Sequence, residues 1–94
     1  MSSNFGEKIR KIRETEEYGR TPFSQLTDIK MATLTGVEQG RSQPRVELVE
    51  KVCQKFPQYA YWLMTGLTDP ENGHISPEIE LARRSLEKGA GTAQ

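Results

Sequence analysis

The chain has few of the residues from which catalytic and metal sites are usually built. Its 94 residues include one cysteine, Cys53, and one histidine, His74. Cys53 cannot form an intrachain disulfide, and its helical spacing with Val52 and Phe56 predicts a packed rather than a reactive thiol. His74 has no second histidine or cysteine at ligand spacing, and no phosphate-cradling glycine loop is present. We therefore expect no metal site, no cofactor and no enzymatic activity.

Long apolar runs and net charge are also absent. No run reaches the roughly 18 apolar residues that span a bilayer, and the first residues, MSSNFGEK, lack the apolar centre of a signal peptide. These absences predict a cytoplasmic protein that does not insert into a membrane. Thirteen basic and thirteen acidic residues give a formal net charge of zero, which argues against strong non-specific binding to nucleic acid. However, residues 20–45 carry four basic and two acidic side chains, so one segment has a small positive excess.

Apolar residues recur at helical spacing along most of the chain, and no convincing strand pattern is found. The first helix is expected to begin at Asn4, as its N-cap, and to bury Phe5, Ile9 and Ile12. It should fray after Glu16 and be closed by Gly19. Further helices are predicted from Thr21 to about Leu26, from Met31 to Gln39 before Gly40, from Val46 to Phe56, and from Gln58 to Met64.

The composition changes toward the C-terminus. The stretch TDPENGHI combines proline, glycine, asparagine and aspartate, which predicts a loop over residues 67–76. A hydroxyl, a proline and an acid from Ser76 to Glu78 are typical of a helix start, so we expect a helix over 77–88. Gly89 should end this helix, and residues 89–94 are expected to form a disordered tail.

The segment from Phe23 to Pro44, FSQLTDIKMATLTGVEQGRSQP, is the most informative part of the chain. A short helix, a tight turn from Thr27 to Lys30 and a second short helix stopped by Gly40 have the spacing of a helix-turn-helix, whose second helix lies in the DNA major groove. Leu34 and Val37 share one face of that helix and should be buried. Its other sides carry Thr33, Thr35 and Gly36.

With these residues in place, the chain resembles the phage repressor and Cro family of helix-turn-helix regulators, also called the XRE family. The resemblance covers about two thirds of the chain, from Phe5 to Gly66. It rests on the order and spacing of Ile9 to Arg13, FSQLTDI, LTGVEQGRSQP and YWLMTG. It implies an all-α fold, in which residues 1–66 form a compact five-helix lambda-repressor-like bundle and the 77–88 helix is an addition. It also implies double-stranded DNA as the partner.

Matched position by position, the resemblance implies three sets of site residues. Arg13 and Glu38 match a pair that forms a salt bridge between the first helix and the end of the recognition helix. The residues expected to contact DNA phosphates flank the recognition helix and are Arg20, Thr21, Arg41, Ser42, Gln43 and Arg45. The residues expected to read bases lie at its start and outer face and are Lys30, Met31, Ala32, Thr33, Thr35 and Gly36.

The recognition helix departs from the usual family pattern. Family members often carry glutamine, asparagine or arginine on the outer face, whereas this chain has small residues and a mid-helix glycine, which costs about 1 kcal/mol of helix stability relative to alanine. One interpretation is a close approach to the groove, with specificity from methyl contacts and DNA shape. The other is a helix that no longer reads DNA. We favour the first.

The sequence therefore predicts a sequence-specific DNA-binding regulator that acts in the cytoplasm at the nucleoid. We expect a repressor that binds a palindromic operator as a homodimer, and the alternative is an antitoxin or a protein-interaction adaptor with the same fold. The C-terminal helix has an apolar stripe too narrow to fold alone, so it should pair with a second copy, hold a protein partner or fold back on its own domain. The residues expected at the dimer interface are Tyr59, Trp62, Ile79, Ala82 and Leu86.

Overall fold

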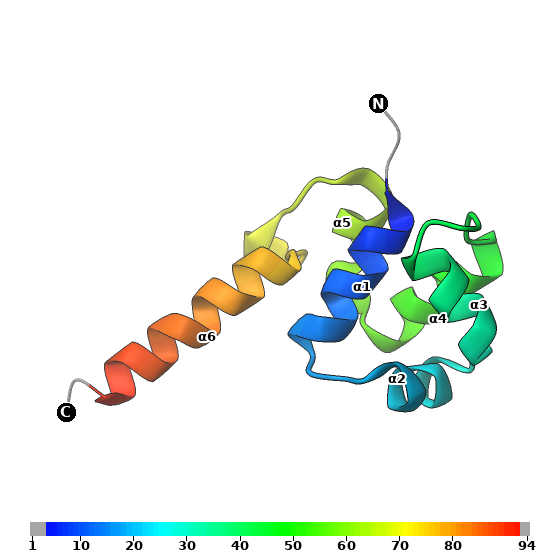
Figure 1. The fold of residues 1–94 in the computed structure, drawn as a ribbon. Helices are drawn as coiled ribbons and strands as arrows, with labels where there is room; N and C mark the ends of the chain where they lie inside the picture. The colour runs from blue at the N-terminus through cyan, green and yellow to red at the C-terminus, as the bar shows by residue number, and fades with distance from the viewer. Residues whose placement is uncertain (1–3, 93–94) are drawn as a thin grey trace.

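The computed structural model describes residues 4–92, with residues 89–92 described by their backbone alone, and the fold is all-α as predicted (Figure 1). Within this range the only strand-like pairing is an isolated antiparallel bridge between Asp69 and His74. The α-helices are α1 (Phe5–Thr15), α2 (Arg20–Thr27), α3 (Met31–Glu38), α4 (Val46–Lys55), α5 (Ala60–Thr65) and α6 (Pro77–Thr92), and the 3-10 turns are η1 (Pro57–Tyr59) and η2 (Pro70–Asn72).

The core is formed by apolar side chains from α1 to α5. Ile9 and Ile12 of α1 are fully buried, and Leu34 and Val37 of α3 belong to the same buried cluster. These are the positions that helical spacing assigns to the inner faces of the two helices. The helix-turn-helix thus packs against α1 and α4 to form the bundle.

Aromatic rings fill the part of the core where α2, α4 and η1 meet. Phe23 and Phe56 stack with their ring centroids 5.7 Å apart and their planes 8° from parallel. Tyr18 lies with its ring centroid 6.2 Å from that of Phe23 and 6.1 Å from that of Phe56. Tyr59 is also fully buried, so its ring helps to close this part of the core.

The two ends of α1 differ in how well they were predicted. Asn4 is the N-cap, and its side-chain oxygen accepts a hydrogen bond from the backbone N–H of Glu7 at 3.0 Å. The C-terminal prediction was wrong, because Gly19 does not close α1. The left-handed residue of this turn is Glu17, with φ of 65°, whereas Gly19 is extended and serves as the N-cap of α2. Arg13 Nη1 donates to the carbonyl oxygen of Tyr18 at 3.0 Å, which ties this turn to α1.

The turn between α2 and α3 lies where the sequence predicts it. Asp28 adopts the left-handed conformation, with φ of 60° and ψ of 39°, and ends α2. The next residue, Ile29, is buried and donates its backbone N–H to the carbonyl oxygen of Ser24 at 3.1 Å. Lys51 of α4 donates to the carbonyl oxygen of Asp28 at 2.7 Å. This hydrogen bond links the turn to α4.

The C-terminal helix packs its first turns on α1 and then extends away from the bundle, on the side opposite α3 (Figure 1). The molecule is therefore elongated, with extents of 46 × 27 × 22 Å. The preceding loop contains η2 and is tied to the bundle by a 3.0 Å hydrogen bond from Ile75 N to the carbonyl oxygen of Gln58. Among the helices of residues 4–92, none combines the length and apolar character needed to cross a bilayer.

The predicted end of the C-terminal helix differs from the structure. The helix continues through Gly89 to Thr92, so Gly89 does not end it and residues 89–92 are not a separate tail. A glycine stops a helix where the chain turns into the left-handed region, as Gly40, Gly66 and Gly73 do. Gly89 has a helical backbone instead. Residues 93 and 94 of the predicted tail lie outside the described range.

Candidate nucleic-acid interface

The recognition helix α3 is buried on one side and open on the other. Leu34 and Val37 face the core, whereas Met31, Ala32 and Thr33 are exposed. Because α6 packs on α1 at the other side of the bundle (Figure 1), it does not cover this surface. The open side of α3 is therefore available to a large ligand such as a DNA groove.

A buried carboxylate anchors the end of α3 to the rest of the bundle. The Glu38 side chain is 0% exposed. Arg13 Nε donates to Oε2 of Glu38 at 2.8 Å, and Arg13 Nη2 donates to Oε1 at 3.0 Å. This is the ion pair that the family resemblance implies. Both carboxylate oxygens are paired, which offsets the cost of removing the charge from water.

The same carboxylate also holds Arg20, which was expected only to contact phosphate. Arg20 Nε donates to Oε1 of Glu38 at 3.0 Å, and 30% of the Arg20 side chain remains exposed. The terminal Nη groups take no part in this bond. Glu38, the last residue of α3, thus orients Arg20, the first residue of α2. This connection was not predicted from the sequence.

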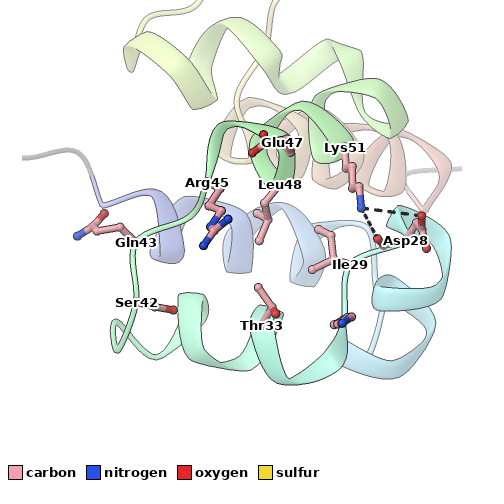
Figure 2. A pocket seen from close by; sticks show the side chains of 10 residues that line it. Asp28, Ile29, Thr33, Ser42, Gln43, Arg45, Glu47, Leu48 and Lys51 are labelled. Atoms are coloured by element: carbon pink, nitrogen blue, oxygen red, sulfur yellow. Dashed lines mark hydrogen bonds and ion pairs between the residues drawn. The ribbon is translucent and has the colours of Figure 1, made fainter.

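A hollow of about 720 Å³ lies between α3 and the start of α4 (Figure 2). It gathers predicted base-reading and phosphate-contacting residues from separate segments, and these are Lys30, Thr33, Ser42, Gln43 and Arg45. The other predicted residues lie outside the hollow: Arg20 and Thr21 in the first turn of α2, Met31, Ala32, Thr35 and Gly36 in α3, and Arg41 in the loop after it. The predicted set therefore forms a broad surface around α3 rather than one pocket.

The hollow also has charged residues that were not predicted from the sequence. Lys51 lines it, and its Nζ lies 3.8 Å from Oδ2 of Asp28 as well as bonding to the carbonyl oxygen (Figure 2). Glu47, exposed in the first turn of α4, adds a negative charge beside Arg45. No local pattern identifies these residues, because they reach the hollow only through the packing of α4 on α2.

The glycine in α3 has a structural explanation within the chain. A Cβ added to Gly36 would lie 3.2 Å from Ser42 Oγ. The Gly36 carbonyl oxygen also accepts the backbone N–H groups of Arg41 and Ser42, at 2.8 and 3.3 Å. The loop after α3 therefore folds back over Gly36, which makes room for Ser42 beside the open face of the helix.

The predicted dimer residues do not form one surface. Tyr59 is fully buried and its hydroxyl donates to Oε2 of Glu16 at 2.6 Å, so its assignment to an interface was wrong. Trp62 and Ile79 are half-buried, whereas Ala82 is exposed and Leu86 is 76% exposed.

An exposed apolar surface lies elsewhere and was not predicted. Val46 is 81% exposed and Met64 is 54% exposed. Both line an apolar hollow of about 410 Å³ together with Phe5, Pro44, Val49, Glu50 and Cys53. Burial raises the pKa of the Cys53 thiol, which keeps it protonated. Within the described residues, no group of three His, Cys, Asp or Glu side chains is arranged to hold a metal ion.

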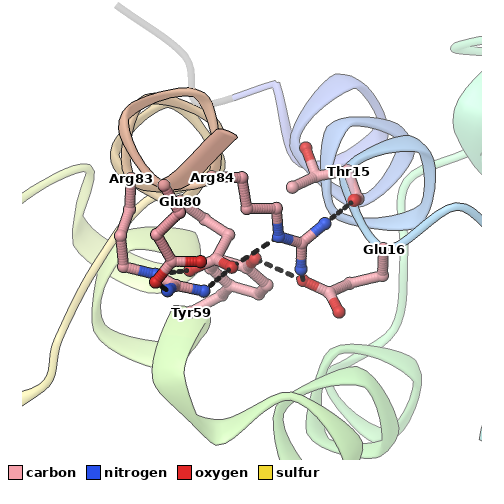
Figure 3. A network of polar contacts seen from close by, with 7 residues as sticks. Thr15, Glu16, Tyr59, Glu80, Arg83 and Arg84 are labelled. Atoms are coloured by element: carbon pink, nitrogen blue, oxygen red, sulfur yellow. Dashed lines mark hydrogen bonds and ion pairs between the residues drawn. The ribbon is translucent and has the colours of Figure 1, made fainter. Parts of the chain in front are cut away.

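A polar network attaches α6 to α1 (Figure 3). Arg84 donates to Glu80 Oε2 at 2.6 Å, to the carbonyl oxygen of Thr15 at 2.7 Å and to Glu16 Oε2 at 3.1 Å. Hydrogen bonds from Arg83, and then from Arg84, lower the pKa of Glu80. The helix is therefore held to the bundle by its polar side, which leaves Ala82 and Leu86 uncovered.

Comparison with known proteins identifies two relatives, and no protein-family model matches the chain. It is 35% identical over 81 residues to Repressor protein C of Escherichia phage P2, an alignment that covers 84% of this chain and 82% of that protein. It is 28% identical over 89 residues to Antitoxin PezA of Streptococcus pneumoniae serotype 4 (strain ATCC BAA-334 / TIGR4), which covers 90% of this chain and 54% of the antitoxin. The chain thus spans about half the length of the second relative.

Proposed function

Because the chain belongs to the phage repressor family of helix-turn-helix regulators, we propose that it is a DNA-binding transcriptional repressor that occupies a palindromic operator as a homodimer. It acts without catalysis, in the cytoplasm at the nucleoid. The observation that carries this proposal is the open face of α3, which is flanked by exposed basic residues and anchored from behind by Glu38.

The surface around α3 supports a division between residues that contact phosphates and residues that contact bases. Arg20 and Thr21 begin α2, which packs on α3, and the loop from Arg41 to Arg45 follows α3. Side chains on two sides of a recognition helix contact the two phosphate strands of a major groove and set the helix in register. Lys30 and the first turn of α3 then meet the base edges.

The homodimer would place two α3 helices in successive major grooves, about 34 Å apart on one face of the duplex. We assign the interface to the uncovered stripe of α6, formed by Ala82 and Leu86 with the half-buried Ile79. An exposed leucine on a projecting helix supports this choice, because burying a leucine side chain contributes about 1.5–3 kcal/mol. Occupation of the operator would exclude RNA polymerase from the promoter.

A second candidate function is that of an antitoxin or adaptor, in which α6 binds a different protein. The projection of α6 beyond the bundle and the similarity to an antitoxin favour it. The surface around α3 stays the same in this case, and the antitoxin version also binds DNA. A purified toxin partner that forms a stable complex through α6, while DNA binding persists, would identify this alternative.

The deciding experiment is selection of bound duplexes from a random pool by the full chain, read by sequencing. We expect an enriched inverted repeat whose affinity falls steeply with salt, because several phosphates are neutralised on binding. The matched variant is Arg41→Gln with Arg45→Gln, which should weaken binding uniformly across sequences and lower the salt slope by about 2. Absence of any enriched sequence, together with no retention on duplex DNA at low salt, would overturn the proposal.

A further inference from the structure

We propose that α3 selects its operator through the C5-methyl groups of thymine, so that the contacted base pairs of each half-site are A·T pairs read by apolar contact. This inference rests on the proposed function and names the chemical feature of the DNA that the helix recognises. Two observations support it: α3 exposes methyl groups, and it lacks the arginine and amide side chains that identify other bases.

Each exposed side chain in the first turn of α3 carries a methyl group, and only Thr33 adds a hydroxyl. Met31 is 42% exposed, and Ala32 and Thr33 are also exposed. At the spacing of an α-helix, Ala32 and Gly36 lie one turn apart and roughly opposite the buried Leu34 and Val37. At its centre, the first turn of the open face therefore carries only the methyl group of Ala32, whereas Gly36 lies beside Ser42 of the following loop.

Polar base-reading groups are missing from the same face. Glu38 is the one charged residue of α3, and its carboxylate is fully buried against Arg13 and Arg20. The Glu38 carboxylate is therefore not available to accept a hydrogen bond from the N4 amino group of cytosine. No arginine, glutamine or asparagine occurs between residues 31 and 38, so the bidentate pairs that identify guanine and adenine are not available there. The hydroxyls of Thr33 and Thr35 are the polar side-chain groups that remain.

Flanking residues supply hydrogen bonds only at the two ends of α3. Lys30 precedes the helix and is exposed, and Ser42 reaches the other end through the loop that folds over Gly36. Between these ends the polar side-chain groups are the two threonine hydroxyls, and the other exposed groups are the apolar side chains of Met31 and Ala32. The one apolar group on the base edges of the major groove is the thymine methyl, so it is the feature that this surface fits.

The magnitude of the effect follows from the burial of one methyl group. Each contacted thymine methyl should contribute about fourfold in affinity, the equivalent of one buried CH₂ group. In a palindromic operator each contacted position occurs twice. Replacing every contacted thymine should therefore reduce affinity by at least about tenfold.

The test compares thymine with uracil, which pairs identically and lacks the C5-methyl group. Two random duplex pools, one containing thymine and the other uracil in its place, are selected in parallel with the full chain. The operator recovered from the thymine pool is then synthesised with single uracil replacements. We expect about a fourfold loss at each contacted position, no loss outside the footprint, and weaker enrichment from the uracil pool.

A protein variant provides a second measurement. Ala32→Gln places an amide at the centre of the open face, where it can donate to and accept from adenine N6 and N7. Ala32 is exposed, so this change should leave the helical circular dichroism spectrum unaltered. We expect the variant to change the selected sequence and to lose most of its sensitivity to uracil.

The outcomes separate the two levels of the proposal. Equal affinity for the thymine and uracil forms of a recovered operator overturns recognition through methyl groups and leaves the repressor function intact. Failure to enrich any sequence from the thymine pool overturns both, and then favours a protein as the ligand of this face.

Discussion

Gly6 of α1 is in direct contact with the backbone of Val37 in α3. A Cβ atom added to Gly6 would collide with the carbonyl oxygen of Val37 and lie 3.0 Å from its carbonyl carbon. Only glycine allows the two helix backbones to approach so closely. The absence of a side chain at residue 6 therefore sets how near the recognition helix lies to α1.

Gly6→Ala should destabilise the fold, because the new methyl group meets backbone atoms that cannot rotate away. We expect a loss of about 1–3 kcal/mol in the free energy of unfolding, measured by urea denaturation. The matched control is Gly36→Ala, whose Cβ meets only the exposed hydroxyl of Ser42. That variant gains helix propensity but requires the Ser42 side chain to shift, so its stability should change by less than about 1 kcal/mol. A neutral Gly6→Ala variant would show that α1 and α3 are not in backbone contact.

Arg13 and Arg20 share Glu38 but should differ in what their removal changes. Arg13→Met removes both hydrogen bonds from Arg13 and leaves Oε2 of the buried carboxylate without a partner, whereas Oε1 keeps Arg20, so it should cost up to about 3 kcal/mol of unfolding free energy. Arg20→Met leaves the Arg13 pair in place, so stability should change less while DNA affinity falls and its salt slope drops by about 1. Urea denaturation and salt titrations of binding distinguish the two effects. Equal stability losses for both variants would contradict this division.

The buried phenol of Tyr59 should make the fold sensitive to alkali. Burial, followed by the hydrogen bond to Glu16, raises the pKa of Tyr59 above its ordinary value. The unfolded chain releases the phenolic proton near pH 10, whereas the folded chain retains it. The resulting stability is complete below about pH 10 and is lost as the pH rises above that value.

Tyr59→Phe provides the measurement of this effect. Thermal unfolding of both proteins is followed between neutral pH and about pH 11, a range that begins below the ordinary tyrosine pKa. The wild-type protein should lose stability more steeply than the variant above about pH 10. Parallel curves for the two proteins would mean that another group titrates instead. At neutral pH the variant lacks the hydrogen bond to Glu16 and should be slightly less stable.

Leu86→Glu should shift the homodimer toward the monomer, because a charge replaces an exposed apolar side chain on the proposed interface. Sedimentation equilibrium measures the change. Val46→Glu is the matched variant, since Val46 is exposed to a similar extent but lies on the hollow near Met64. We expect the Val46 variant to remain dimeric. The reverse result would move the interface from α6 to that hollow.

Lys30 and Thr33 test the face that reads DNA. Changing both to alanine removes the cation at the start of α3 and both the methyl and the hydroxyl group of Thr33, and both side chains are exposed. The double variant should lose its sequence-specific footprint and keep its helical content. An unchanged operator affinity would remove these residues from the reading face.

Local spacing in the sequence determined the helices and which side of each one is buried. The inner face of α3 follows from Leu34 and Val37 alone, and the cap at Asn4 follows from one side chain and the N–H three residues later. Both depend on residues within a single turn of helix. The turn at Asp28, where φ is positive, also lies inside the segment predicted as a turn.

The tertiary structure alone decided the features that join distant residues. These include the contact of Gly6 with Val37, the bond of Arg20 to Glu38 and the burial of Tyr59. Helical periodicity states which residues share a face, but it contains no distance between two helices. The angle at which α1 meets α3 arises from how their side chains fill the core. Residues that act across that contact therefore become recognisable only in the folded chain.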